Sequence, residues 1–302
     1  MELMFEFFAS IFGYVLAFLY NLVNNYGFAI ILFTVIIKLL LLPLSIKQQK
    51  TMKKSAKMQE KMKVIQFKYK NDPEKMNQEI MNLYKNEKMS PFSGCLTAII
   101  QFLLLLSIFY LVRCPITYME KLSNEDINKY VGQLQEEGKE VSKAYPEIDL
   151  IREYEWLKEK NPEDEQVEKL NLQMNFLGLD LSKIPQQNMT DYTVYIIPVL
   201  YILSSFVSIR MTTAMQQKQM QKKKETEIDG ETGEVIEKEG ENEMDAVMQT
   251  NKMMSWMMPI MSISIAFVAP LGLALYWLIS NLLMIVERVV LDKVIKQEDG
   301  ED

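Results

Sequence analysis

Histidine is absent from this chain of 302 residues, and cysteine occurs only twice. Without histidine, the chain cannot form a histidine metal site, use histidine as a catalytic acid or base, or contain a triad that needs histidine. Two cysteines cannot form a disulfide scaffold or a four-cysteine metal site. The sequence also lacks a Walker-type glycine-rich loop for nucleotide phosphates. We therefore expect no catalytic residue, no metal site and no cofactor.

Long apolar segments are concealed by the average composition. A mean hydropathy of −0.04 with 24% charged residues is typical of a soluble protein. The apolar residues nevertheless gather in blocks of spanning length, at Tyr26–Leu44, Pro91–Val112, Tyr192–Ile209 and Met253–Leu291. The last block is about twice as long as one span requires, and it carries Ala269-Pro270-Leu271-Gly272 near its middle. We interpret it as two helices joined by a tight turn.

These blocks predict an all-α polytopic membrane protein: a five-helix transmembrane bundle with a cytoplasmic helical hairpin and an N-terminal interfacial helix. The expected segments, in chain order, are an N-terminal interfacial or signal-like helix 1–24, a first span 25–45, a cytoplasmic hairpin 46–90, a second span 91–112, an acidic helical stretch outside the cytoplasm 113–190, a third span 191–210, a partly disordered cytoplasmic loop 211–252, a fourth span 253–269, a fifth span 270–291 and an acidic cytoplasmic tail 292–302.

The N-terminal segment allows three interpretations. Residues 1–24 are mostly apolar and could be a signal-like segment, a sixth span, or a helix lying in the membrane interface. The segment begins with Glu2 and Glu6 and lacks the basic start of a signal peptide. We therefore favour an uncleaved interfacial helix.

The distribution of lysine and arginine predicts the orientation of the spans. Residues 45–90 hold twelve lysines against five acidic residues, a net charge of +7. Residues 113–190 hold ten basic and sixteen acidic residues, a net charge of −6. Lysine and arginine return after the third span, at Arg210 and Lys222 to Lys224. We therefore expect a multi-pass protein of the bacterial plasma membrane with its N-terminus outside and its C-terminus in the cytoplasm.

The cytoplasmic stretch is expected to form two helical arms. Asp72 followed by Pro73 is typical of a helix start and marks the turn between the arms. Methionines lie at helical spacing on both arms, including Met58, Met62 and Met76. This stripe could pack the arms together, or it could form an adaptable contact surface for apolar client segments or the ribosome. The two interpretations are compatible.

Lys38 is taken as the only charged side chain inside any of the five expected spans. A charge at this depth is costly, and it commonly marks a functional site with water or a partner nearby. Alternatively, the long side chain reaches the cytoplasmic edge by snorkelling. Thr34 lies one turn away on the same helix face, and Gln101 and Asn281 are further polar candidates. Without an acidic partner in the spans, the cation suggests a wet groove open to the cytoplasm.

Several motifs resemble the YidC/Oxa/Alb family of membrane protein insertases in its short bacterial form, over residues 1–112 and 174–292. The motifs are YGFAIILFTVIIKLLLLPLSIKQQ, EIMNLYKNEKMSPFSGCLTAIIQ, NFLGLDLS, MMPIM and APLGLALYWLISNLLMIVE. The resemblance implies a membrane insertase and chaperone whose five helices enclose a positively charged, hydrophilic groove open to cytoplasm and lipid. Lys38 matches the family's groove cation, Thr34 and Gln101 its polar neighbours, and Tyr276 and Trp277 an aromatic pair near the client path.

The resemblance also implies partners. These are nascent membrane proteins, membrane lipids, and the Sec translocon, the signal recognition particle pathway and the ribosome; no specific reading of nucleic acid is expected. The chain departs from the family at Lys38, where arginine is usual, so the charge is kept but bidentate recognition of carboxylates is lost. The acidic tail also differs from the basic ribosome-binding tails of some members.

Three other functions remain as alternatives. A small-solute transporter or channel would use Lys38 as an anion or proton site, but no internal repeat is visible. A structural membrane adaptor would depend on the cytoplasmic hairpin and not on Lys38. An intramembrane enzyme is least favoured, because neither histidine nor a carboxylate is expected within the spans to build an acid–base pair.

Overall fold

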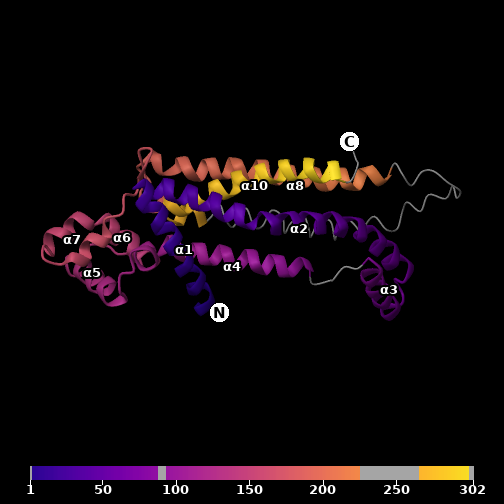
Figure 1. Ribbon diagram of the computed structural model, residues 1–302, viewed down its shortest axis with the longest axis horizontal. Helices are drawn as coiled ribbons and strands as arrows, with labels where there is room; N and C mark the ends of the chain where they lie inside the picture. The colour runs from indigo at the N-terminus through magenta and orange to yellow at the C-terminus, as the bar shows by residue number, and fades with distance from the viewer. Residues whose placement is uncertain (1, 88–92, 225–264, 299–302) are drawn as a thin grey trace. The chain divides into compact units, whose positions relative to one another are not determined.

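The computed structural model describes residues 2–87, 93–224 and 265–298 (Figure 1). The chain divides into two compact units. The first unit combines residues 1–40, 100–204 and 262–284. The second combines residues 41–99, 205–261 and 285–302. Segments far apart in the sequence therefore form each unit.

Long apolar helices dominate the chain, as an all-α polytopic membrane protein requires. Within the described residues, four apolar segments are long enough to cross a membrane: Phe5–Val23, Tyr26–Thr51, Tyr192–Met211 and Leu271–Asp292. The shorter segment Phe102–Arg113 is also apolar. The long helices are α1 (Glu2–Val23), α2 (Tyr26–Lys68), α3 (Pro73–Asn86), α4 (Ser93–Arg113), α8 (Ile196–Lys224) and α10 (Leu271–Glu298).

Helix α8 continues past the end of the third span that the sequence predicts. α8 runs to Lys224, so the first part of the expected cytoplasmic loop 211–252 is helical. This part is rich in Gln, Lys and Met, which favour helix. The predicted turn before Leu271 is confirmed, because helical residues end at Val268 and α10 begins at Leu271. The disorder expected at residues 227–243 and most of the expected fourth span lie outside the described residues.

α1 is apolar on both its buried and its exposed faces. Ala9, Leu16 and Leu19 are buried in the core of the first unit. Phe7 and Phe18 are exposed on the other face. A helix of this kind lies against protein on one side and can face lipid on the other, and the interfacial placement of residues 1–24 stays a prediction.

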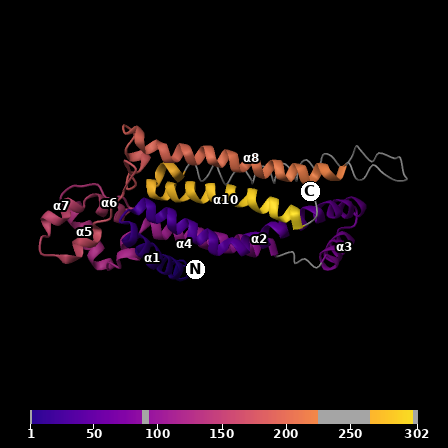
Figure 2. The ribbon, with the colours of Figure 1, turned by 45° about the horizontal axis from the view of Figure 1, so that its top comes forward.

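The acidic stretch that follows α4 folds into a set of short elements, here called the outer domain (residues 114–190). Figure 2 shows α5, α6 and α7 clustered together within it. The Ser123 hydroxyl caps α5 by accepting a hydrogen bond from Asp126 N (3.1 Å), and Pro146 opens α6. Its elements are η1 (Ile116–Glu120), α5 (Asn124–Glu136), α6 (Pro146–Arg152), α7 (Tyr154–Lys160), η2 (Glu165–Leu170), the antiparallel pair β1 (Asn175–Phe176) and β2 (Leu179–Asp180), and η3 (Pro185–Gln187).

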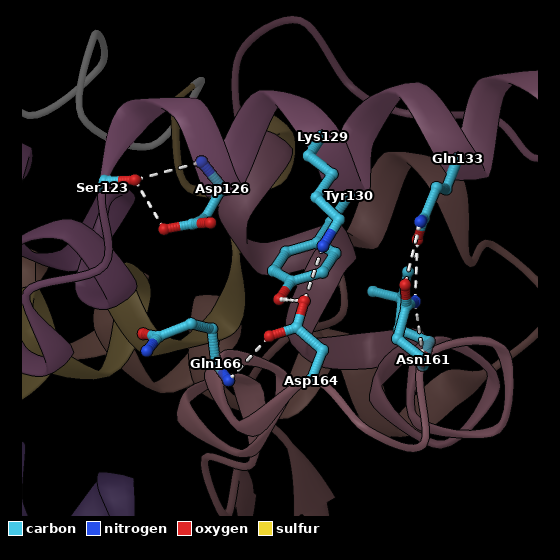
Figure 3. Close-up of polar contacts among 9 residues, drawn as sticks. Ser123, Asp126, Lys129, Tyr130, Gln133, Asn161, Asp164 and Gln166 are labelled. Atoms are coloured by element: carbon cyan, nitrogen blue, oxygen red, sulfur yellow. Dashed lines mark hydrogen bonds and ion pairs between the residues drawn. The ribbon is translucent and has the colours of Figure 1, made fainter.

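Side-chain hydrogen bonds close the outer domain around α5 (Figure 3). The carboxylate of Asp164 accepts from Lys129 Nζ (2.6 Å) and from the hydroxyl of Tyr130 (2.8 Å). The amides of Gln133 and Asn161 bond reciprocally at 3.0 and 2.8 Å. Because the Tyr130 side chain is fully buried, its hydroxyl needs such a partner.

A buried carboxyl group joins η1 to α6. Glu147 accepts hydrogen bonds from Thr117 N (3.0 Å) and from the Thr117 hydroxyl (2.6 Å). Burial raises the pKa of Glu147, although these hydrogen bonds act in the opposite direction. Burial, together with the nearby Glu147, raises the pKa of the Cys114 thiol to about 12. This thiol is therefore protonated and unreactive at neutral pH.

Residues 173–183, here called the strap, hold the starts of α2 and α10. Tyr26 N donates to the carbonyl of Gln173 (3.0 Å), and Gln173 N donates to the Tyr20 hydroxyl of α1 (2.8 Å). Leu271 N and Gly272 N donate to strap carbonyls at 2.9 and 3.0 Å. The first N–H groups of a helix have no partner in the helix itself. The strap supplies these partners for both helices.

In the second unit, the C-terminal part of α2 and the whole of α3 form the predicted hairpin. Asp72 caps α3 by accepting from Lys75 N (3.1 Å), with Pro73 at the first helical position, which confirms the predicted start. Lys61 and Glu87 form an ion pair between the arms. Met58 is buried, whereas Met62 and Met76 are half-buried. The burial of Met58 favours the interpretation that this side chain packs the arms together. A role of the three methionines in contacting clients stays a prediction.

A tight contact between α1 and η1 provides a test of this packing. A Cβ atom on Gly13 would lie 2.2 Å from the carbonyl oxygen of Tyr118, which is backbone and cannot turn aside. We expect Gly13→Ala to lower the stability by about 1–3 kcal/mol, read as a lower Tm of the detergent-solubilised protein.

The matched control is Gly132→Ala in α5, where a Cβ atom meets nothing within 4 Å. This change should be neutral or stabilising by up to about 1 kcal/mol, since alanine favours helix over glycine. Equal Tm values for the two variants would contradict the close approach of α1 and η1.

Candidate functional site

Lys38 lies on α2 where a buried face meets an exposed one. Its side chain is half-buried. Thr34, one turn earlier, is buried and donates its hydroxyl to the Ile30 carbonyl (2.6 Å). The neighbours Leu39 and Leu40 are 63% and 71% exposed. The cation therefore stands at the border between the interior of the first unit and an apolar surface suited to lipid.

A second polar group joins α8 to α10 within the first unit. Asn281 is buried and donates from Nδ2 to the Ser204 hydroxyl (2.9 Å). Ser204 in turn donates to the Tyr201 carbonyl (2.8 Å). The rings of Tyr201 and Trp277 lie 6.1 Å apart between centroids. Two of the predicted site residues therefore contact α8: Asn281 through Ser204, and Trp277 through Tyr201.

The remaining predicted residues have less definite roles. Tyr276 is buried next to half-buried Trp277, so only the tryptophan presents substantial surface. Gln101 belongs to α4, and its side chain lies outside the described part of the chain. The polar character expected around Thr34 is reduced, because its hydroxyl is bonded to its own helix.

The expectation of a single charged residue within the spans is wrong for α10. Glu287 and Arg288 both fall inside the apolar segment Leu271–Asp292. In the second unit, Arg288 Nη1 donates to the Ser208 carbonyl at 3.5 Å. The sequence itself carried this signal, but both residues lie close to the end of the span, where snorkelling lowers the cost of a charge.

Other concave or charged regions have a structural role. Among the described residues, no group of three or more histidine, cysteine, aspartate or glutamate side chains could hold a metal ion. One hollow of about 250 Å³ lies on the outer domain beside Lys158, Asp164 and Glu168. These three side chains already form ion pairs within the domain.

Comparison with known proteins assigns the chain to a family and finds similar curated proteins. The model of the family "60Kd inner membrane protein" matches residues 18–298. A membrane protein insertase YidC from Caldanaerobacter subterraneus subsp. tengcongensis is 43% identical over 101 residues, or 33% of this chain and 49% of the relative. The YidC of Syntrophus aciditrophicus is 52% identical over 86 residues, covering 28% of this chain and 16% of the relative. The matches thus span about half or less of these curated relatives.

The bond between Asn281 and Ser204 can be measured by a double-mutant cycle. We expect Asn281→Ala and Ser204→Ala to be coupled by about 0.6–1.7 kcal/mol, the range for hydrogen bonds between membrane helices. The free energy of unfolding is measured in lipid or detergent for the wild type, the two single variants and the double variant.

Ser107→Ala is the control, because this buried hydroxyl donates to the Leu103 carbonyl of its own helix (2.8 Å). Its combination with Asn281→Ala should be additive. Additive energies for the Asn281 and Ser204 pair as well would show that the bond contributes nothing.

Proposed function

Because the chain belongs to the 60Kd inner membrane protein family, we propose that it inserts nascent membrane proteins into the plasma membrane and assists their folding. The observation that carries this proposal is the family match over residues 18–298. It is supported by the apolar helices of a multi-pass membrane protein and by curated relatives that are named membrane protein insertases.

We place the client path beside Lys38 and the contact between α8 and α10. The acidic outer segment of a client rests near the Lys38 cation while its apolar helix leaves along the exposed leucines of α2. Thr34, Gln101, Tyr276, Trp277 and Asn281 complete the candidate client-binding groove. Lysine attracts a carboxylate as a point charge, without the two parallel hydrogen bonds of arginine.

The groove lowers the cost of moving polar groups through the bilayer. Each polar group that enters hydrocarbon without a partner costs several kcal/mol. A partly wet path with one fixed cation reduces this cost for an acidic segment. The energy for the movement then comes from burial of the client's apolar helix and, for acidic segments, from the membrane potential.

The orientation follows from the charges of the two ends of the molecule. We place the cytoplasmic hairpin, with a net charge of +7 over residues 45–90, inside, and the outer domain outside. Both chain ends then follow, with the N-terminus outside and the C-terminus in the cytoplasm. The basic hairpin is the proposed contact for the ribosome, the signal recognition particle pathway and the Sec translocon.

Exposed lysines in each region test this orientation. In a variant with both Cys95→Ser and Cys114→Ser, an introduced cysteine can be labelled alone. We expect Lys143→Cys to react with a membrane-impermeant maleimide added to spheroplasts. Lys85→Cys should react only after the membrane is permeabilised, and the reverse pattern would contradict the assignment.

The charge at position 38 tests the insertion mechanism. In cells depleted of their own insertase, we expect Lys38→Ala to reduce insertion of a small client with an acidic outer segment roughly tenfold, or about 1.4 kcal/mol. Lys38→Glu should reduce it further by repulsion, and Lys38→Arg should restore it. Insertion is measured by protease protection of the client.

The control for that series is Lys143→Ala, because this lysine is exposed on the outer domain. It should insert the client as well as the wild type does. If Lys38→Ala and Lys38→Glu also insert the client normally, the charged groove is not the mechanism. Saturable flux of a small solute in liposomes that is lost in Lys38→Ala would favour a transporter instead. Crosslinking from positions 38, 277 and 76 to nascent chains identifies the surfaces that clients touch.

A further inference from the structure

The spans of the first unit carry continuous apolar surfaces that face outward. On α2, Phe28, Leu32, Ile36 and Leu39 are exposed and recur every three or four residues. On α8, the exposed residues begin at Ile196. Residues at this spacing share one face of a helix. These are the surfaces that acyl chains cover when the helices cross a bilayer.

Three large apolar or aromatic side chains lie exposed just beyond these surfaces. Leu177 is 77% exposed, Met189 64% and Tyr192 84%. Tyr192 opens the short helix η4 (Tyr192–Tyr195), which leads directly into α8. Leu177 stands at the tip of the hairpin between β1 and β2. We call these three residues the outer rim.

The conformation of the hairpin tip is unfavourable for leucine in water. Leu177 and Gly178 both have positive φ angles, of 51° and 83°. Two-residue turns of this kind favour Asn-Gly, because asparagine tolerates the left-handed region and is well hydrated. Leucine pays a steric cost at this position and exposes its whole side chain. An apolar environment around the tip offsets both disadvantages.

The hairpin is held at the level of the first turn of α2. The ring of Phe176 packs edge-on against Phe28, with centroids 5.0 Å apart. The same ring lies so close to Gly27 that a Cβ atom there would stand 2.4 Å from it. Asn25 Nδ2 also donates to the Asn175 carbonyl (2.7 Å). The tip therefore lies where the apolar span begins.

Tyr192 of the outer rim, which follows Met189 by three residues, is tied to the same level. Asp191, directly before Tyr192, pairs with Lys183 of the strap at 2.8 Å. This pair also neutralises the charges next to the rim, which lowers the cost of placing it near hydrocarbon. Tyr192 precedes Ile196 by four residues, roughly 8 Å at the rise of a 3₁₀-helix. Tyrosine is enriched at this depth, between acyl chains and water.

We propose that the outer rim of Leu177, Met189 and Tyr192 inserts into the headgroup–acyl boundary of the outer leaflet and binds lipid there. The rim continues the lipid-facing surfaces of α2 and α8 beyond the helix starts. It fixes the height of the strap, and so of the starts of α2 and α10, relative to the membrane. This lipid contact does not depend on the proposed insertase function.

The test uses the full-length chain in vesicles of phosphatidylcholine and phosphatidylglycerol. A nitroxide is attached at Leu177→Cys or Tyr192→Cys, each in a background with Cys95→Ser and Cys114→Ser. The control is Gln135→Cys, because this residue is exposed near the end of α5 in the outer domain. Collision of each label with oxygen, which enters lipid, is compared with collision with a water-soluble nickel chelate.

We expect the oxygen-to-chelate collision ratio to be several-fold higher at positions 177 and 192 than at position 135. Ratios at 177 and 192 equal to that at 135 would mean that the rim faces water, and would overturn the proposal. Shielding of these labels from both reagents would indicate contact with protein, and would overturn it as well. Because the three positions are exposed, the labels should not disturb folding, which circular dichroism of each variant verifies.

Discussion

Backbone N–H groups in the first turn of a helix have no partner in that helix, and near a bilayer each one left open costs several kcal/mol. In this protein the strap provides hydrogen-bond acceptors for the first turns of two helices. Its carbonyl groups accept from Tyr26 at the start of α2 and from Leu271 and Gly272 at the start of α10. Its own backbone is bonded to Tyr20 of α1. Three helix ends are therefore held by a single short segment, and the outer domain is continuous with it.

This arrangement gives the first unit a rigid outer end. Gly13 allows η1 to approach α1, and Gly27 allows the ring of Phe176 to lie on α2. The contact between α8 and α10 is polar, unlike these close approaches at glycine. It includes a buried hydrogen bond from Asn281 to Ser204. Close packing near the strap and the polar contact between α8 and α10 are both compatible with the client path proposed above.

Prediction from the sequence succeeded at the start of α3, where the signal is local. The cap at Asp72 was predicted from two adjacent residues and is confirmed by its hydrogen bond. The length of α8 was underestimated, because its polar continuation loses the apolar signal but keeps its helix propensity. The burial of Thr34 could not be read from the sequence, since polarity alone does not tell which neighbour covers a hydroxyl.

The sequence by itself determined the apolar helices, the opposite charges of the two extramembrane regions and the family, because hydropathy, charge and motifs are properties of consecutive residues. Only the tertiary structure decided that residue 25 meets residue 175, that Asn281 reaches Ser204 across 77 positions, and that Leu177 stands exposed at the level where a span begins. Such contacts depend on the distance and direction between groups that chain folding brings together. Neither quantity is contained in a local pattern of residue types.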